Sequence, residues 1–511
     1  MNRRAFLQGF LASAGFVSLG GCRNLFAAPA GWTPAGKANL TFGVLSDLHV
    51  RLWKDGKSLS YHHDTKTFRK ALEYFKSRGV DAVMIAGDLA DKGLTDELEA
   101  IAKVWYEVFP EGCGVEKIFV YGNHDLDGHA YGNYAAQCFK DEDIRKQHIL
   151  ATDMKGNWER IFHESESSVF MKTVKGYRFI GSQWDHHIEC EGGDFGTLLK
   201  PFLDAHKDEL TGDKPFFYVQ HAHLKDTVFG PWAWGHDDGG ATAALSAYPN
   251  AVAFSGHSHF SETDERAIWQ GAFTAVCCSS LRYTGLIDCF RGDVKPDYEN
   301  GFSGGESAIM PRYDSNDGQQ GLLVSVYDDA IVYERHDFRY GRKLGPDWVQ
   351  MLGSAAGGDA PRYGEGRPFA FESRKAKEVP PAFAADATIK TKATEGKKRG
   401  KGRQPTLEAI EIRFPAANAS VTRPYGYRVR VSGVDGEAVG DAAGETHRGT
   451  EAVERFVLAQ GYNMPLEDQR AQGESYITLA KAILPKGEKL KVTVEPFSSF
   501  GTFGNPIEGS L

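Results

Sequence analysis

The sequence predicts an α/β domain followed by a smaller, all-β domain. Three observations support this division. Short apolar runs alternate with helix-like segments from residue 40 to residue 121, strand-like alternation recurs after residue 406, and a stretch rich in Lys, Ala, Pro and Gly separates the two regions. At 511 residues the chain is too long for one ordinary core. We therefore expect a main domain over 38–373, a basic linker or loop over 374–405 and a second domain over 406–511.

The main domain begins with apolar runs at 40–46, 82–86 and 117–121, which predict buried strands. Between them, the segments 68–79 and 95–109 carry apolar residues at helical spacing. Strands that alternate with helices predict parallel pairing, with the helices packed on the sheet. In such sheets the loops at the carboxyl ends of the strands build the binding site.

The remainder of the main domain predicts a mixed sheet rather than a purely parallel one. Lys175-Gly176 is a short turn between two strand-like runs, and Asp328 and Asp329 occupy the turn of a predicted hairpin. The strands and the hairpin are expected at 168–174, 177–181, 216–220, 252–255, 273–277 and 322–333. Cys277 and Cys278 end one of these apolar runs and are expected to be buried free thiols.

The second domain is expected to be a small β-rich module of the sandwich type, because its apolar and polar residues alternate. Its strands are expected at 409–414, 427–431, 475–479 and 489–494. The basic run 397–403 precedes the module and lacks interleaved aromatic residues, so we expect a solvated linker or loop tip there.

The first thirty residues are expected to be an export signal outside the fold. Arg3 and Arg4 precede a short apolar run, as in twin-arginine signals. Leu19-Gly20-Gly21-Cys22 resembles a lipoprotein cleavage box, which predicts a lipidated Cys22 and a lipid anchor in the periplasm or cell envelope. Ordinary cleavage near Ala30 is the alternative.

The net charge of -9 argues against a dedicated nucleic-acid binder, which usually carries a basic excess. It leaves a phosphate-bearing substrate open, because metal ions in a site would dominate the local field.

Short motifs rich in metal-ligating residues follow the predicted strands. Each motif places Asp, Asn or His where an apolar run ends, and divalent metals bind carboxylate, amide oxygen and imidazole ligands. In chain order the motifs are Asp47-Leu48-His49, Gly87-Asp88, Gly122-Asn123-His124-Asp125, His221 and Gly256-His257-Ser258-His259.

The spacing of two motifs would direct both ligands of each pair into one cavity. On an extended backbone, residues two apart point the same way, which applies to Asp47 with His49 and to His257 with His259. Glycines before the ligands permit close backbone approach. Alone, His221 would be interpreted as a core or surface histidine. The joint occurrence of the motifs, in order and at strand ends, favours a metal site.

The motif order DxH, GD, GNH[DE], H and GHxH resembles that of the calcineurin-like metallophosphoesterase superfamily, over residues 47–259. The resemblance implies that 38–373 is a catalytic domain with a four-layer α-β-β-α sandwich and a two-metal centre. By the same resemblance, the first metal would be held by Asp47, His49 and His259, and the second by Asn123, His221 and His257, with Asp88 bridging. His124 would contact the phosphoryl group and protonate the leaving oxygen, and Asp125 would orient that histidine.

The implied activity is hydrolysis of phosphomonoesters or phosphodiesters, by attack of a hydroxide that bridges two metal ions. The ligand types do not decide whether the metal ions are manganese, iron or zinc. His62, His63 and His223 are candidate substrate contacts, with solvated loop residues as the alternative. The sequence leaves a second functional class as an alternative, in which the chain is a surface-binding protein whose second domain targets glycans.

Overall fold

The computed structural model of the protein describes residues 32–51, 65–126, 134–184, 194–230, 233–285, 308–309, 318–352, 369–397, 405–418, 422–433, 452–485 and 489–511. The predicted signal segment with Cys22 lies outside these ranges, and so do His62 and His63. Within the described residues, no helix is both long and apolar enough to span a membrane.

The first sheet of the main domain has seven strands and mixed direction. Its order is β13 (Arg342–Lys343), β12 (Ala330–Asp337), β11 (Gln320–Val326), β1 (Leu40–Leu45), β2 (Ala82–Ala86) and β3 (Glu116–Val120), with β14 (Trp348–Met351) paired to β12. β1, β2 and β3 are parallel, whereas β11 pairs with β1 and with β12 in the antiparallel direction. The predicted strands and the hairpin are therefore confirmed.

The second sheet of the main domain has six strands. Its order is β4 (Val169–Val174), β5 (Tyr177–Ser182), β6 (Phe216–Val219), β7 (Ala251–Ser255), β9 (Thr274–Cys277) and β8 (Ile268–Gln270). β5, β6, β7 and β9 are parallel, and β4 and β8 are antiparallel edge strands. Cys277 and Cys278 are buried free thiols, as predicted.

The two sheets pack face to face through aromatic side chains. Phe42 of β1 contacts three rings of the second sheet, with centroids 5.2 Å from Phe179, 4.8 Å from Phe217 and 5.9 Å from Phe254. All four side chains are fully buried. This shared core fixes one sheet against the other, so their strand ends meet at a common edge.

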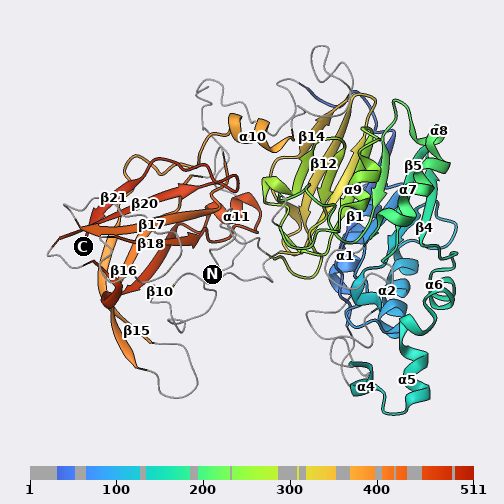
Figure 1. Ribbon diagram of the computed structural model, residues 1–511, viewed down its shortest axis with the longest axis horizontal. Coiled ribbons are helices and arrows are strands. Elements are labelled where there is room, and N and C mark those ends of the chain that lie inside the picture. The colour runs from blue at the N-terminus through green and yellow to red at the C-terminus, as the bar shows by residue number, and fades with distance from the viewer. Residues whose placement is uncertain are drawn as a thin grey trace, which may run out of the picture.

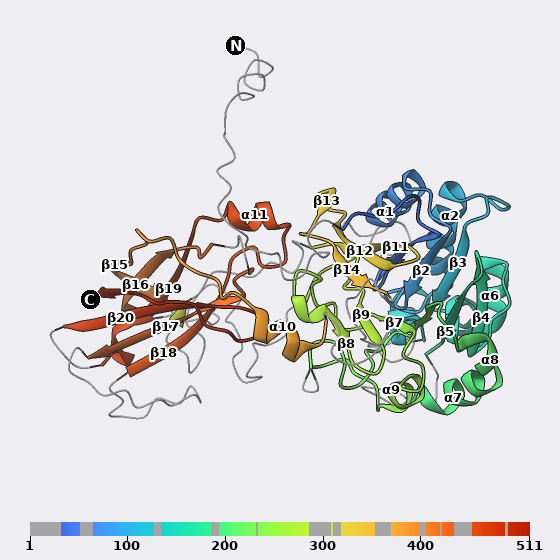
Figure 2. The same ribbon diagram turned by 90° about the horizontal axis from the view of Figure 1, so that it is seen from above.

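Helices cover the outer faces of both sheets. α1 (Lys66–Ser77) buries the stripe formed by Phe68, Leu72 and Phe75, as its helical periodicity predicts. Figure 2 shows α1 and α2 on one outer side and α7 and α9 on the other, with the two sheets between them. The expected four layers are present. The helices are α1, α2 (Thr95–Val108), α3 (Asn123–Leu126), α4 (Tyr134–Cys138), α5 (Glu142–His148), α6 (Met154–Phe162), α7 (Gly196–Ala205), α8 (Lys207–Leu210) and α9 (Gly240–Leu245).

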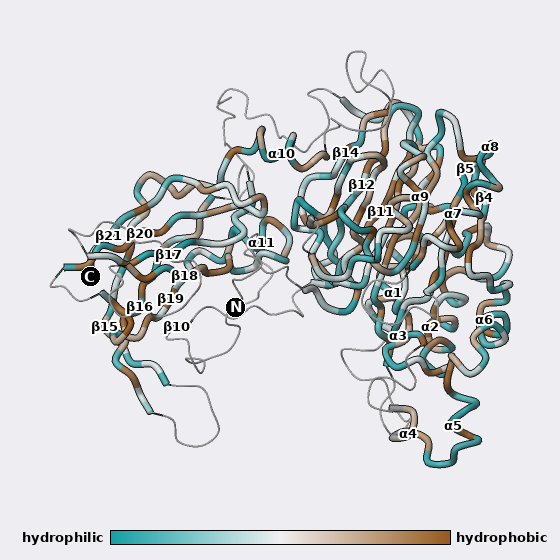
Figure 3. Tube along the Cα trace, viewed as in Figure 1, coloured by the Kyte–Doolittle hydropathy of each residue, from teal (hydrophilic) through white to brown (hydrophobic). Residues whose placement is uncertain are grey.

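The C-terminal region is a β-sandwich of two antiparallel sheets (Figure 1). One sheet is β10 (Ala308–Ile309), β19 (Glu474–Ala480), β16 (Thr406–Pro415) and β15 (Lys390–Lys397), and the other is β18 (Ala452–Leu458), β17 (Gly426–Gly433), β20 (Leu490–Phe497) and β21 (Ile507–Ser510). Ile412 and Ile477 from the first sheet share one buried cluster with Val429 and Val492 from the second. Figure 3 shows hydrophobic residues along the strands of both regions of the chain.

The segment 374–405 is not a simple linker. It includes most of α10 (Phe371–Lys377) and all of β15, which pairs along its whole length with β16. β15 is an edge strand with mostly exposed residues, so it lacks the apolar alternation by which strands are predicted. Most of the basic run, residues 398–403, lies between β15 and β16 and outside the described residues.

The sandwich and the main domain share a continuous core. Tyr425, Tyr462 and Phe497 of the sandwich are almost fully buried and belong to the same apolar cluster as the strands of the main domain. α11 (Leu466–Arg470) continues this contact, because the Leu466 amide donates to the carbonyl oxygen of Leu344. The second domain is therefore packed against the first through a buried interface.

Candidate metal centre

The predicted ligands lie where strands of the two sheets end. Asp47 and His49 follow β1, and Asp88 follows β2. Asn123 is the first residue of α3, directly after β3 and Tyr121-Gly122. From the second sheet, His221 follows β6, while His257 and His259 follow β7. Because these strands are parallel neighbours within each sheet and the sheets pack together, their ligands converge on one edge.

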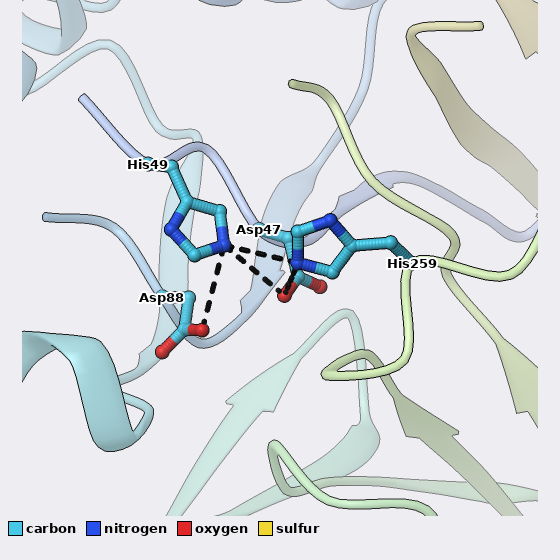
Figure 4. Close-up of side chains that lie close together, drawn as sticks. All are labelled: Asp47, His49, Asp88 and His259. Carbon is cyan, nitrogen blue, oxygen red and sulfur yellow. Dashed lines mark hydrogen bonds and ion pairs between the residues drawn. The ribbon is translucent and has the colours of Figure 1, made fainter. Parts of the chain in front are cut away.

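Asp47, His49, Asp88 and His259 form one buried group of potential ligands (Figure 4). The Nε2 atoms of His49 and His259 face each other at 3.0 Å. Oδ1 of Asp47 lies 2.9 Å from Nε2 of His259, and Oδ2 of Asp88 lies 3.5 Å from Nε2 of His49. Four donor atoms of the types that bind divalent cations therefore point at a common volume.

Asp88, His221 and His257 form a second group. Nε2 of His221 lies 3.1 Å from Oδ2 of Asp88 and 3.2 Å from Nδ1 of His257. Asp88 thus belongs to both groups, through the same carboxylate oxygen that approaches His49. A carboxylate shared by two ligand groups has the arrangement needed to bridge two cations.

The backbone of the ligand loops is left-handed, not extended. The φ angles are 53° at Asp47, 45° at His49, 51° at Asp88, 70° at His257 and 57° at His259. Non-glycine residues rarely adopt positive φ, and clusters of such residues are typical of functional sites. The expectation that alternation along an extended strand aligns each pair is therefore wrong, although both pairs do converge. Their convergence depends on tightly curved loops.

Tertiary hydrogen bonds hold these loops in shape. The amide of Asp47 donates to the carbonyl oxygen of Gly87, and the amide of His49 donates to that of Asp88, both at 3.0 Å. The amide of His257 donates to Oδ2 of Asp47, again at 3.0 Å. Loops from three strands are thereby tied to one another around the ligands.

The glycines of the motifs permit close approach, as predicted. Gly87 has a φ of +94°, and a Cβ atom there would collide with the ring of His221. A Cβ on Gly256 would collide with Ser46 and with the carboxylate of Asp47. Any side chain at either position would displace a ligand.

Two ligand histidines are oriented by their second ring nitrogen. Nδ1 of His221 lies 2.7 Å from the carbonyl oxygen of Ala86. Because a carbonyl oxygen can only accept, Nδ1 carries the proton, and Nε2 is the nitrogen that could bind a metal ion. Nδ1 of His49 lies 3.1 Å from Oδ1 of Asp91. A carboxylate behind a ligating imidazole fixes the ring and raises its basicity.

The electrostatics of the group favour bound cations. Burial alone would raise the pKa of Asp47, but His259 and His49 outweigh it and hold that pKa well below the ordinary value. Burial would lower the pKa of His49, yet Asp47 and Asp91 raise it to about 10. The carboxylates of Asp47 and Asp88 form ion pairs with histidines only within the described chain. Buried carboxylates of this kind require compensating positive charge.

These residues fit divalent metal ions. The Nε2 atoms of His49 and His259 approach to 3.0 Å, and each also faces a carboxylate oxygen, of Asp88 for His49 and of Asp47 for His259. Oδ1 of Asp47 is buried and, among the described residues, accepts no well-aligned hydrogen bond, although Nε2 of His259 lies 2.9 Å away. A cation bound by nitrogen and oxygen together would satisfy all of these atoms.

A family comparison agrees with this geometry. The profile of the calcineurin-like phosphoesterases matches residues 40–261, which span all the ligand positions. Residues 40–261 form a calcineurin-like phosphoesterase domain. A search among curated proteins found no match.

Solved structures of phosphoesterases are similar to part of the chain at low sequence identity. A dimetal phosphatase from Danio rerio is 11% identical, with 61% of this chain and 99% of that one covered and a TM-score of 0.36. A purple acid phosphatase from yellow lupin, Lupinus luteus, is also 11% identical, with 62% and 54% covered and a TM-score of 0.38.

In the phosphoesterase domain, His124 lies beside the first ligand group. Its ring meets that of His49 edge-on, with centroids 4.5 Å apart. Its Nδ1 lies 2.9 Å from the carbonyl oxygen of Asp91, which can only accept, so Nδ1 carries the proton. Burial lowers the pKa of His124, although Asp88 opposes the shift.

Asp125 does not orient His124, and that prediction is wrong. Its buried carboxylate accepts hydrogen bonds from the amides of Leu89, Ala90 and Gly122, at 3.2, 2.7 and 2.8 Å. Burial and the charge of Asp88 raise its pKa to about 7. Asp125 therefore fixes the loop that carries Asp88.

His223 is not exposed to a substrate, which corrects another prediction. Its side chain is fully buried, with Nδ1 2.8 Å from Oγ of Ser255 and Nε2 2.6 Å from Oγ of Ser258. Burial holds its pKa well below the ordinary value, so the ring is neutral. His223 supports the loop that carries His257 and His259.

Asn123 lies between two residues that contact Asp88. A Cβ on Gly122 would collide with Oδ1 of Asp88, and the amide of His124 donates to the same oxygen at 3.0 Å. Oδ1 of Asn123 is itself buried. This placement is compatible with the ligand role that the family resemblance implies.

Sequence reasoning assigned no definite role to three residues that surround the ligands. Asp91 orients both His49 and His124, and its GDxxD spacing was the available signal. Trp234 stacks on His257 at 4.7 Å, and Tyr283 packs on His259 at 4.3 Å between ring centroids. Neither aromatic residue lies in a recognisable motif.

Proposed function

We propose that the chain is a binuclear metal-dependent phosphoesterase that hydrolyses phosphomonoesters or phosphodiesters. The observation that carries the proposal is the carboxylate of Asp88, which belongs to two ligand groups at once. The match of residues 40–261 to a phosphoesterase family supports the reaction class.

The first metal would be held by Asp47, His49 and His259, and the second by Asn123, His221 and His257, with Asp88 between them. When bound, two divalent ions of the manganese, iron or zinc type polarise a phosphoryl oxygen and make water acidic enough to provide a nucleophile near neutral pH. The chain itself contributes fixed ligand loops and a buried negative site that attracts the cations.

His124 would contact the phosphoryl group and move the proton. Its Nδ1 donates to the main-chain oxygen of Asp91, so a contact with a substrate would be made through Nε2. Since the ring of His124 lies beside that of His49, it would be close to a phosphoryl group bound at the first ligand group. A protonated Nε2 would then donate to the leaving oxygen.

Metal analysis followed by an activity assay tests the proposal. The purified full chain is expected to carry about two first-row metal ions and to hydrolyse 4-nitrophenyl phosphate or bis(4-nitrophenyl) phosphate. Asp88→Asn should lose metal and activity, while Asp204→Asn, a change of an exposed acid on α7, should retain both. Full activity of Asp88→Asn without bound metal would contradict the proposal.

We also propose export through the twin-arginine pathway and lipidation at Cys22. The support is the arrangement of Arg3 and Arg4, the following apolar run and the Leu19-Gly20-Gly21-Cys22 box. Mass spectrometry of the mature chain tests this, since a lipidated Cys22 at its amino terminus is expected. A mature chain that starts near Ala30 would instead indicate ordinary cleavage.

A further inference from the structure

Two exposed aromatic side chains flank the metal centre. Among the described residues, the large hydrophobic side chains that are exposed are Ile144, Leu198, Trp234, Tyr283 and Val379. The two aromatic members of this set, Trp234 at 50% and Tyr283 at 36% exposure, are the two that touch predicted metal ligands. Exposed large apolar residues gathered at a site indicate contact with a ligand or partner.

The two rings contact different ligand groups. Trp234 stacks nearly parallel on His257 of the second group, with an interplanar angle of 23°. Tyr283 packs on His259 of the first group at 50° and also faces His49, at 6.3 Å and 30°. They therefore lie on the two sides of the centre that Asp88 joins.

The loop of Trp234 is anchored to the ligand loop next to it. The amide of His223 donates to the carbonyl oxygen of Gly235 at 2.8 Å. Gly235 has a φ of +92°, and a Cβ there would come within 3.4 Å of both Ser258 and His257. This close approach holds Trp234 against the ligand ring.

The loop of Tyr283 is anchored in the same way. Oγ of Ser280 donates to the carbonyl oxygen of Asp47 at 3.1 Å and accepts from the amide of Tyr283 at 3.2 Å. The amide of Gly285 donates to the carbonyl oxygen of His259 at 2.6 Å. The loop that carries Tyr283 is thus bonded to two predicted ligand residues, through Ser280 to Asp47 and through Gly285 to His259.

We propose that Trp234 and Tyr283 form a specificity site for phosphate esters whose leaving group contains a planar aromatic ring. A phosphoryl group at the metal centre leaves its ester substituent directed outward, past the rings that border the centre. Stacking on an aromatic side chain favours planar rings and tolerates differences in ring chemistry. An alkyl substituent gains much less from such contacts. This inference rests on the proposed phosphoesterase function.

Binding of two non-hydrolysable phosphonates separates this proposal from the proposed function. Phenylphosphonate and methylphosphonate differ only in the ring, and calorimetric titration of the manganese-loaded full chain measures both. Wild type is expected to bind phenylphosphonate about tenfold more tightly, which corresponds to about 1.4 kcal/mol. Trp234→Ala and Tyr283→Ala should each reduce this preference at least threefold.

Control variants keep the test decisive. Leu198→Ala removes an exposed apolar side chain remote from the ligands and should retain the preference, as should Trp234→Phe and Tyr283→Phe, which keep a ring. The proposal is overturned if wild type does not prefer phenylphosphonate, or if both alanine variants keep the preference. Equal loss of both phosphonates together with lost metal would also overturn it, because the rings would then only shield the ligands. A retained ring preference without hydrolysis of any ester would contradict the proposed function alone.

Discussion

Nδ1 of His49 lies 3.1 Å from Oδ1 of Asp91, and the main-chain oxygen of Asp91 also accepts from His124. Asp91 thus positions a predicted metal ligand with its side chain and the predicted proton donor with its backbone. Asp91, which directly follows Gly87-Asp88-Leu89-Ala90, therefore connects the two functions of the site. Side-chain and main-chain roles can be separated by mutation, because a substitution removes only the carboxylate.

Asp91→Ala is expected to weaken metal binding while leaving the fold intact. Loss of a carboxylate behind a ligating histidine typically lowers metal affinity by about 10–100-fold. Competition with a chelator measures this change in the full chain. Asp204→Ala is the matched control, since that acid is exposed and pairs with Lys200. Unchanged metal affinity in Asp91→Ala would show that His49 needs no orienting partner.

Asp125→Ala is expected to destabilise the protein by about 3 kcal/mol. Three buried amides, of Leu89, Ala90 and Gly122, would lose their acceptor, and each such group costs about 1–3 kcal/mol when none replaces it. Urea unfolding measures the free energy. If Asp125 acted by orienting His124, the variant would instead change the pH profile of activity while keeping full stability.

His124→Ala is expected to lower kcat by about 10²–10⁴-fold with bound metal unchanged, as for loss of a general acid. The effect should be larger for a phenyl ester than for a 4-nitrophenyl ester, because the better leaving group needs less protonation. Steady-state rates on the two esters measure the difference. An equal loss on both esters would assign His124 to phosphoryl binding instead.

Most of the fold was predictable because its strands are local apolar runs. β1, β2 and β3 were placed to within one or two residues, since each run is bounded by polar residues or glycine. β15 was missed because its exposed residues make it a strand only by pairing with β16. Its conformation is decided by a neighbour that the local sequence does not reveal.

The site was predictable in composition but not in geometry. The candidate ligands stand in short motifs at strand ends, so the sequence alone is enough to select them as candidates. The positive φ angles of Asp47 and His49 depend on hydrogen bonds to Gly87 and Asp88, some forty residues away along the chain. The amide partners of Asp125 are equally non-local. Contacts of this kind are formed by the packed sheets, and no local pattern specifies them.

His336 is expected to make the protein less stable at acidic pH. Burial lowers its pKa to about 4, from an ordinary value of 6.5, with Glu334 opposing the shift and Arg78 and Lys343 adding to it. The unfolded chain therefore takes up the proton first, and stability falls as pH decreases from 6.5 through about 4, by at most about 1.4 kcal/mol per pH unit. His336→Phe keeps the stacking on Tyr74 but cannot titrate.

Unfolding free energies at pH 7 and pH 5 test this assignment. Wild type should lose more stability than His336→Phe between the two values. Tyr74 itself stays neutral in this range, because burial and Glu334 raise its pKa above the ordinary value. Identical losses in the two proteins would assign the acid sensitivity to other groups.

Removal of the C-terminal sandwich is expected to unfold or aggregate the phosphoesterase domain. A chain that ends at Lys377 would expose the apolar cluster now covered by Tyr425, Tyr462 and Phe497.

The shortened chain would also lack Asn463, which links the sandwich to the loops around the metal centre. The main-chain oxygen of Asn463 accepts a hydrogen bond from Gln320, and its Nδ2 donates to Thr284, next to Tyr283. Gln320 in turn accepts from Ser261, Ser279 and the amide of Glu262, just beyond the ligand loop of His257 and His259.

The thermal midpoint and solubility of the shortened chain measure this dependence. A full-length variant, Asn463→Ala, tests the polar contact separately and should retain the fold while reducing turnover, because the loop of Tyr283 loses support. A shortened chain that is soluble, stable and fully active on small esters would instead favour a sandwich devoted to surface or glycan binding. The buried interface makes the structural role the expected outcome, since exposing an apolar cluster of this size costs a large part of the free energy of unfolding of an ordinary domain.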